Sequence, residues 1–263
     1  MDLKLSGKHT LVTGSSAGIG KGVASRLLRE GAVVYINGRN AQRLQKTCEE
    51  LKQYGDCRMA LGDAATPEGA RQIMDAVDAD GPLDVLVCNM GTYKGTPYAE
   101  ISDEEWNWML NTNLLSMVRL TRHYLPRMLE RNAGRMVLIA SECGIKPLTD
   151  MIHYSVSKTA VIGLGRGLAE LTKGSRVGVN TVLPGLTWTE NTAAYQTERA
   201  AREGKDLDTA IREYFVTYEP SQLLQRITSV EEIADTVAYF CSELSAATNG
   251  AAIRAEGGLI RSI

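Results

Sequence analysis

The stretch TGSSAGIG at residues 13–20 constrains the fold of this chain more than any other. It follows a short apolar run, residues 10–12, that is typical of a buried strand. It precedes residues 21–28, whose apolar positions recur at helical spacing. A strand, a glycine-rich turn and a helix start form a corner in which backbone N–H groups and the helix dipole favour a phosphate. The alternative is a tight turn that needs glycine only for its positive φ.

Composition argues against several classes of function. The formal net charge is −2 and no Lys/Arg-rich block is present, so we expect no nucleic-acid partner. No apolar run approaches the roughly 18 residues of a membrane span, and the first residues lack the apolar core of a signal peptide. The five cysteines are scattered without a Cys-x-x-Cys pair, so we expect no disulfide framework, no metal site and a cytoplasmic location.

Short apolar runs alternate with helical patterns along the chain. After the first run they recur at residues 32–36, 57–61, 83–88, 135–140, 177–182 and 251–255. Unbroken apolar strands separated by helices are typical of a parallel sheet that is covered on both faces. We therefore predict an α/β fold with one doubly wound, Rossmann-type parallel sheet of about seven strands, in a single domain over residues 1–263.

In such a sheet ligands bind at the carboxyl ends of the strands, so the residues there are candidates for a site. No acid follows the second strand at Asn37, Gly38 or Arg39 to accept a hydrogen bond from a ribose hydroxyl. Arg39 could instead pair with a 2′-phosphate, or it could be a solvated loop cation. Asp63, after the third strand, could accept from an adenine amino group or be a charge at a helix start.

A serine, a tyrosine and a lysine are candidates for the chemistry. Tyr154 and Lys158 share one helix face a single turn apart. An ammonium beside a phenol lowers the pKa of the phenol, which can then act as a general acid or base. Ser141, at the end of the fifth strand, could hold a carbonyl or alcohol oxygen beside them. A Tyr-x-x-x-Lys pair alone is common on helices, and only its combination with this serine and the glycine turn is specific.

These motifs resemble those of the short-chain dehydrogenase/reductase superfamily, and the resemblance covers essentially the whole chain. TGSSAGIG matches the cofactor turn Thr-Gly-x-x-x-Gly-x-Gly, and Ser141 with Tyr154-x-x-x-Lys158 matches the catalytic elements at the usual spacing. Asn113 matches a further catalytic residue on a helix. The segment 184–189 looks like the stretch that binds the nicotinamide carboxamide, with Thr189 at the family threonine.

The resemblance implies hydride transfer between a nicotinamide cofactor and a carbonyl or secondary alcohol. Tyr154 would exchange the proton with the substrate oxygen, and Ser141 would orient that oxygen. Lys158 would lower the pKa of the tyrosine and bind the nicotinamide ribose, and Asn113 would help to hold a relay water. The cofactor residues that it implies are Gly14, Ser15, Ser16, Gly18, Ile19, Gly20, Asn37, Arg39, Asp63, Asn89, Gly91, Tyr154, Lys158, Pro184, Gly185, Thr187 and Thr189.

The expected substrate pocket includes a departure from the family pattern. The usual Asn-Asn-Ala-Gly is Cys-Asn-Met-Gly here, so Met90 could narrow the space over the cofactor. Glu142 and Cys143 follow Ser141 and could line the pocket or only pack. His153 could face the substrate or lie on a helix surface or an interface. The full set of expected pocket residues is Met90, Glu142, Cys143, His153, Leu186, Trp188 and Tyr195.

The main functional hypothesis is an oxidoreductase that transfers a hydride between a small to medium ketone or secondary alcohol and NADP(H), with NAD(H) as the alternative cofactor. A reductase of 3-oxoacyl thioesters on acyl carrier protein is the second candidate. A non-catalytic nucleotide-sensing protein would not explain the Ser–Tyr–Lys set, and a methyltransferase would not explain the Tyr–Lys pair. The family resemblance further implies a homotetramer, with a dimer as the alternative. We also expect residues 186 to about 226 to form a mobile lid over the substrate.

Overall fold

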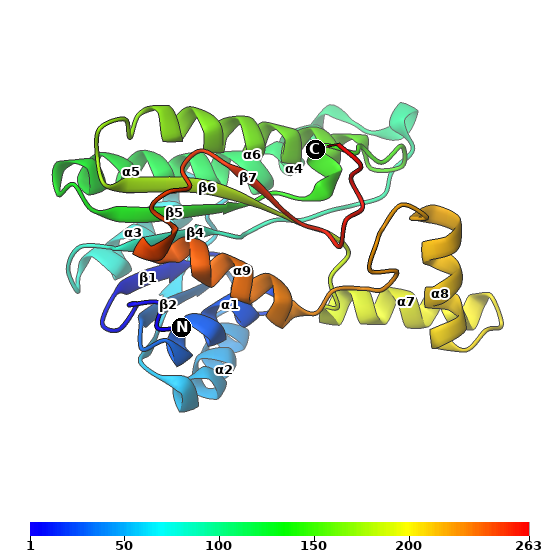
Figure 1. Ribbon diagram of the computed structural model, residues 1–263, viewed down its shortest axis with the longest axis horizontal. Helices are drawn as coiled ribbons and strands as arrows, with labels where there is room; N and C mark the ends of the chain where they lie inside the picture. Colours follow the sequence, from blue (N-terminus) through cyan, green and yellow to red (C-terminus); the bar gives the residue numbers. More distant parts are fainter. Residues whose placement is uncertain (263) are drawn as a thin grey trace.

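A seven-stranded sheet, parallel throughout, organises the computed structural model, which describes residues 1–262. Its strand order is β3-β2-β1-β4-β5-β6-β7, so the chain reverses its direction of winding between β1 and β4 (Figure 1). The predicted Rossmann-type sheet is therefore confirmed. The strands are β1 (His9–Val12), β2 (Val33–Gly38), β3 (Cys57–Leu61), β4 (Val85–Cys88), β5 (Gly134–Ile139), β6 (Val177–Pro184) and β7 (Ala252–Ala255).

Helices cover both faces of this sheet. Figure 1 shows α5 and α6 on one face, and α1, α2 and α9 on the other. The helices are α1 (Gly18–Arg29), α2 (Ala41–Leu51), α3 (Pro67–Asp78), α4 (Asp103–Leu110), α5 (Ser116–Glu130), α6 (Ile152–Glu170), α7 (Glu190–Arg202), α8 (Leu207–Tyr218) and α9 (Val230–Cys241).

Alternate residues of each strand pack into separate cores on the two faces. On β1, Leu11 packs into the core formed with α3, α5 and α6, whereas its neighbour Val12 packs into the core formed with α1, α2 and α9. Both side chains are fully buried. Because successive side chains of a strand point to opposite faces, a sheet covered on both sides requires an unbroken apolar run. This requirement explains the apolar runs in the sequence.

The segment after β6 extends beyond the sheet as a hairpin of α7 and α8 (Figure 1). Its helices are held together by Arg199, whose buried guanidinium donates to the Ala210 carbonyl (2.6 Å), and by the buried ring of Phe215. At its base, Thr187 pairs with Thr228 in an isolated parallel bridge. The two ends of the hairpin are thus joined where it leaves the domain.

Within residues 1–262, no helix is long and apolar enough to cross a membrane. The same residues contain no group of three or more His, Cys, Asp or Glu side chains placed to hold a metal ion.

Candidate active site

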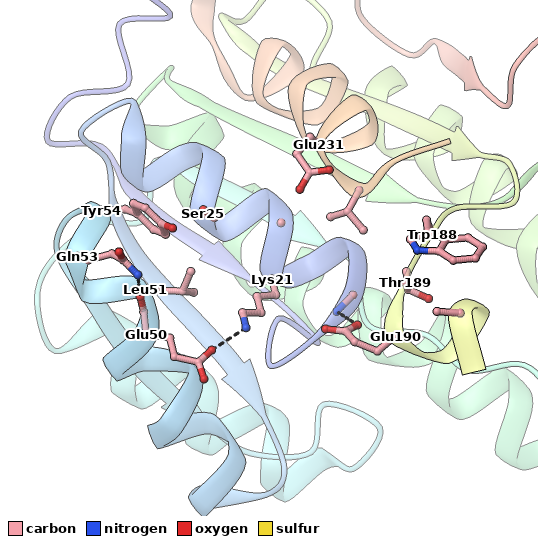
Figure 2. Close-up of a pocket in the computed structure, with 14 residues that line it drawn as sticks. Lys21, Ser25, Glu50, Leu51, Gln53, Tyr54, Trp188, Thr189, Glu190 and Glu231 are labelled. Atoms are coloured by element: carbon pink, nitrogen blue, oxygen red, sulfur yellow. Dashed lines mark hydrogen bonds and ion pairs between the residues drawn. The ribbon is translucent and has the colours of Figure 1, made fainter. Parts of the chain in front are cut away.

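The glycine turn after β1 forms a corner that holds an anionic oxygen. Gly14 has a φ of +61°, and a Cβ there would come within 2.9 Å of the Met90 Cα, so only glycine fits. The N-cap of α1, Ala17, makes no side-chain hydrogen bond to the first turn. The Gly18 N–H donates instead to a carboxylate oxygen of Glu190 (3.0 Å), as Figure 2 shows. An anion therefore already occupies the helix start, and the corner fits the pyrophosphate of a dinucleotide.

Two of the expected cofactor residues build this turn with their side chains. Asn37 is buried; its amide oxygen accepts from the Gly14 N–H (3.2 Å), and its amide nitrogen donates to the Ala60 carbonyl (2.8 Å). Ser15 is also buried, and its hydroxyl donates to the Val12 carbonyl (2.6 Å) and accepts from the Asn37 N–H (2.9 Å). The side-chain hydrogen bonds of Asn37 and Ser15 are thus satisfied inside the protein, and their contact with a cofactor stays a prediction.

Asn89 joins the end of β4 to the same turn. Its amide donates to the carbonyls of Thr13 (2.9 Å) and Gly14 (3.2 Å), and its N–H donates to the Thr13 hydroxyl (2.9 Å). Two residues on, Gly91 lies against Lys158: a Cβ at Gly91 would be 3.2 Å from the Lys158 Nζ. The loop after β4 thereby places the glycine turn next to the Tyr–Lys helix.

The end of β2 leaves a free cation beside this corner. The Arg39 side chain is 79% exposed, and its Nη1 lies 3.8 Å from an Asp63 carboxylate oxygen. The other oxygen of Asp63 accepts from the Ala65 N–H (2.9 Å). Ser16 lies close to the same loop, since a Cβ at Gly38 would be 3.3 Å from its hydroxyl. With so loose an ion pair, the guanidinium can turn toward a phosphate.

Ser141, Tyr154 and Lys158 meet at the carboxyl end of β5. The Ser141 hydroxyl donates to a carboxylate oxygen of Glu142 (2.7 Å) and accepts from the Cys143 N–H (3.2 Å). On α6, the buried Lys158 Nζ donates to the Ile139 carbonyl (3.1 Å) and lies 5.7 Å from the centre of the Tyr154 ring. The expected trio is therefore assembled in space.

Asn113 stands in a π-helical turn, Asn111–Leu115, between α4 and α5. Its buried amide donates to the Ser157 hydroxyl (2.9 Å) and the Thr92 carbonyl (2.9 Å), and accepts from the Thr92 N–H (2.7 Å). Such wide turns occur frequently at functional sites. This one brings Asn113 to the residue that precedes Lys158.

Burial controls the protonation of the site. It lowers the pKa of Lys158 to about 8, although Cys143 and Glu142 oppose the change. The pKa of Tyr154 is raised, first by burial and then by Cys143 and Glu142, while hydrogen bonding to Ser141 acts against these causes. The expected lowering of the Tyr154 pKa is therefore wrong for the protein alone. The raised pKa favours the neutral phenol there.

The model of the short chain dehydrogenase family matches residues 8–200. The chain belongs to this family. The expected class, an NAD(P)-dependent oxidoreductase, is thereby confirmed.

Three relatives illustrate the range of short chain dehydrogenases similar to this chain. The uncharacterized oxidoreductase YvrD of Bacillus subtilis is 47% identical over 263 residues, covering all of both chains. The 3-oxoacyl-[acyl-carrier-protein] reductase FabG of Aquifex aeolicus is 31% identical over 265 residues, covering 98% of this chain and 100% of that one. The L-sorbose reductase of Gluconobacter frateurii, solved with NADPH and L-sorbose, superposes over 100% of both chains with a TM-score of 0.94 at 30% identity.

Among the expected pocket residues of this short chain dehydrogenase, His153 requires a correction. Its ring is fully buried, 3.1 Å from a Glu105 carboxylate oxygen and edge-on to Trp106. It belongs to the packing of α4 against α6, not to the group around Ser141. Cys143 is also buried, and burial raises the pKa of its thiol to about 12, so it is no nucleophile. Tyr195 is exposed on α7.

Two features of the site were missed from the sequence. Tyr93 stands edge-on to Tyr154, with 6.2 Å between the ring centres. Tyr93 follows Asn89-x-Gly91 in the loop after β4, and this position is the sequence signal that could have identified it. Lys146 and Glu219 form an ion pair that ties the loop after β5 to the end of α8. No local pattern indicates that pair, since its members are far apart in the sequence.

A cavity of about 680 Å³ opens beside the glycine corner (Figure 2). Gly18 and residues of α1, α2, α7 and α9 line it, together with Trp188 and Thr189. Lys21 and Glu50 pair across its wall (2.7 Å). Ser141, Tyr154 and Lys158 do not line this cavity, which borders the cofactor corner.

Proposed function

We propose that this protein transfers a hydride between NADP(H) and a small to medium ketone or secondary alcohol. The observation that carries the proposal is the meeting of Ser141, Tyr154 and Lys158 at the end of β5, next to a glycine corner that holds an anion. Neither feature alone requires redox chemistry. Together they support a site in which a proton donor and an oxygen-binding hydroxyl lie beside a bound dinucleotide.

Each residue of the trio then has a role. The nicotinamide ring supplies or accepts the hydride when the cofactor is bound. Ser141 donates a hydrogen bond to the substrate oxygen, and Tyr154 gives that oxygen its proton in reduction and removes it in oxidation. Lys158 holds the nicotinamide ribose and stabilises the phenolate left on Tyr154. Asn113 helps to hold a water that returns the proton from solvent.

Preference for NADP(H) follows from the end of β2. Residues 37–39 include no acid to bind a ribose hydroxyl, and the exposed Arg39 guanidinium, held only loosely by Asp63, can pair with a 2′-phosphate. The bound NADPH of the L-sorbose reductase supports the same cofactor. NAD(H) would lack the phosphate contact and bind more weakly.

Residues 186–226 act as the lid of this site in our proposal. The Thr187–Thr228 bridge gives the α7–α8 hairpin a narrow base, and the Thr189 methyl would be 3.4 Å from a Cβ at Gly18. The hairpin thus begins directly at the cofactor corner. Trp188 and Tyr195 are exposed on it and can close over a substrate.

We place the enzyme in the cytoplasm.

A second candidate substrate is a 3-oxoacyl thioester, favoured by the similarity to the Aquifex aeolicus reductase. Acetoacetyl-CoA is a convenient probe for it. Reduction of acetoacetyl-CoA with a much higher kcat/KM than any free ketone would favour this candidate over the first.

The proposed chemistry is tested by following NADPH consumption with a panel of ketones. Tyr154→Phe removes the proton donor and keeps the ring, so turnover should fall by about 10²- to 10⁴-fold. Tyr124→Phe is the matched control, because the Tyr124 hydroxyl is buried on α5 without a hydrogen-bond partner among residues 1–262. Full activity of the Tyr154 variant would disprove the role of the phenol.

A further inference from the structure

A carboxylate stands inside the site without a role in the proposed proton transfer. Glu142 directly follows Ser141, in the short 3-10 turn Glu142–Gly144. One of its oxygens accepts from the Ser141 hydroxyl (2.7 Å), and the other lies 3.6 Å from the Cys143 thiol. Burial raises the pKa of the Glu142 carboxyl, and the hydrogen bond from Ser141 opposes the change. The side chain is therefore held against the group that orients the substrate.

The Ser141 hydroxyl can donate only one hydrogen bond, and without a ligand it donates that bond to the Glu142 carboxylate. To bind a substrate carbonyl, Ser141 must turn that proton away from the carboxylate. Among residues 1–262, the only other side chain that donates to Glu142 is the weak thiol of Cys143. A plain ketone would thus leave the half-buried Glu142 carboxylate with only the weak thiol donor of Cys143, which opposes the binding of that ketone.

We infer that Glu142 is a specificity-determining residue that selects ketones with a hydroxyl group on the carbon next to the carbonyl. This inference rests on the proposed function. The carbonyl oxygen accepts from Ser141 while the neighbouring hydroxyl donates to Glu142, so both protein groups keep a hydrogen bond. The two oxygens of such a ketone are close neighbours, as are the Ser141 and Glu142 oxygens at 2.7 Å. A site built to bond a hydroxyl rejects the analogue that lacks it.

A second carboxylate nearby does not share this role. Glu219 lies close enough to raise the pKa of Glu142. It is, however, paired with Lys146 and nearly buried at the end of α8. Its charge is already compensated, so it needs no donor from the substrate. Glu219 therefore provides a control for a change of carboxylate in the same neighbourhood.

The test compares hydroxyacetone with butanone, which differ by a hydroxyl in place of a methyl group. With NADPH, the wild-type kcat/KM should be about 10- to 100-fold higher for hydroxyacetone, the effect of one hydrogen bond to a charged group. Glu142→Val should bring the kcat/KM values for hydroxyacetone and butanone within about threefold of each other. The main reason is that butanone then no longer leaves a carboxylate without a hydrogen-bond donor. Glu142→Gln, which keeps the shape and weakens the bond, should give an intermediate ratio. Glu219→Gln should leave the ratio unchanged.

The outcomes separate this inference from the proposed function. Reduction of both ketones with equal kcat/KM, or an unchanged ratio in the Glu142 variants, overturns the inference and leaves ketone reduction intact. Failure to reduce any ketone overturns the proposed function and the inference with it. Circular dichroism checks that the valine variant is folded, and if it is not, the glutamine variant decides alone, since a retained wild-type ratio there counts against the inference.

Discussion

Lys158 is a buried cation, and among residues 1–262 its ammonium donates one hydrogen bond, to the Ile139 carbonyl. Its pKa is about 8 in the folded protein and 10.5 when exposed, because burial disfavours the ammonium. Below pH 8 Lys158 is protonated in both the folded and the unfolded protein, so the folded protein is destabilised by the full free-energy cost of burying the ammonium. Between pH 8 and pH 10.5 the unfolded chain binds more protons than the folded protein. The free energy of unfolding therefore rises with pH as the buried lysine becomes neutral.

Lys158→Met should therefore stabilise the protein without cofactor, and more at neutral than at alkaline pH. We expect its gain in unfolding free energy to be larger by roughly 1–3 kcal/mol at about pH 7 than at about pH 9.5. Urea unfolding of both proteins at the two pH values measures the difference. A gain that is independent of pH would show that Lys158 titrates normally.

We expect the choice between NADPH and NADH to depend on Arg39. Arg39→Ala should weaken NADPH binding by about one to two decades, the value of a hydrogen bond to a charged group of roughly 1.5–3 kcal/mol, and leave NADH almost unchanged. Dissociation constants for both cofactors measure this, with Arg71→Ala, an exposed arginine on α3, as the control. Equal losses for NADPH and NADH would mean that Arg39 does not recognise the phosphate.

At the scale of elements, Glu190 couples the α7–α8 hairpin to the cofactor corner. It is in the first turn of α7, and its carboxylate accepts from the Gly18 N–H at the start of α1. A pyrophosphate at the start of α1 must displace the Glu190 carboxylate, since both anions would bind at the positive end of the same helix dipole. We therefore expect cofactor binding to release the base of the hairpin from the glycine turn.

Glu190→Gln should consequently tighten NADPH binding by about two- to fivefold, because the competing charge is removed. Quenching of tryptophan fluorescence reports the binding, with Trp188 close to the contact. Glu231→Gln is a fitting control, since Glu231 lines the same cavity (Figure 2) but lies on α9. If both variants bind NADPH alike, the contact between Glu190 and Gly18 does not compete with the cofactor.

For the whole molecule, we expect a homotetramer that uses α4, α5 and α6. Trp108 on α4 and Val156 on α6 are large apolar side chains that stay exposed in the single chain. Covering such groups with other subunits would bury apolar area. Sedimentation at micromolar concentration should show a tetramer, and Trp108→Glu should shift it to smaller species. Met59→Glu, on the edge strand β3, should not. A wild-type monomer would exclude the assembly.

Local patterns in the sequence were enough to predict the sheet and the positions of the main motifs. The alternation of apolar runs with helices predicted the parallel sheet, because a strand that is buried on both faces must be apolar at every position. The glycine turn and the spacing of Tyr154 and Lys158 are local as well. They required only that the strand ends meet at one edge, which parallel strands guarantee.

The tertiary structure alone decided what the polar side chains of this edge do. Asn37 and Ser15 build the glycine turn, and His153 packs against Trp106. Burial also reversed the expected direction of the Tyr154 pKa shift, and the Ser141 hydroxyl donates its hydrogen bond to Glu142. Hydrogen bonding and desolvation depend on neighbours brought from distant parts of the chain. The sequence therefore predicted the glycine turn and the Ser141, Tyr154 and Lys158 set but not the place of Tyr93 or His153, and only the fold determined which hydrogen bonds and charges remain available to a ligand.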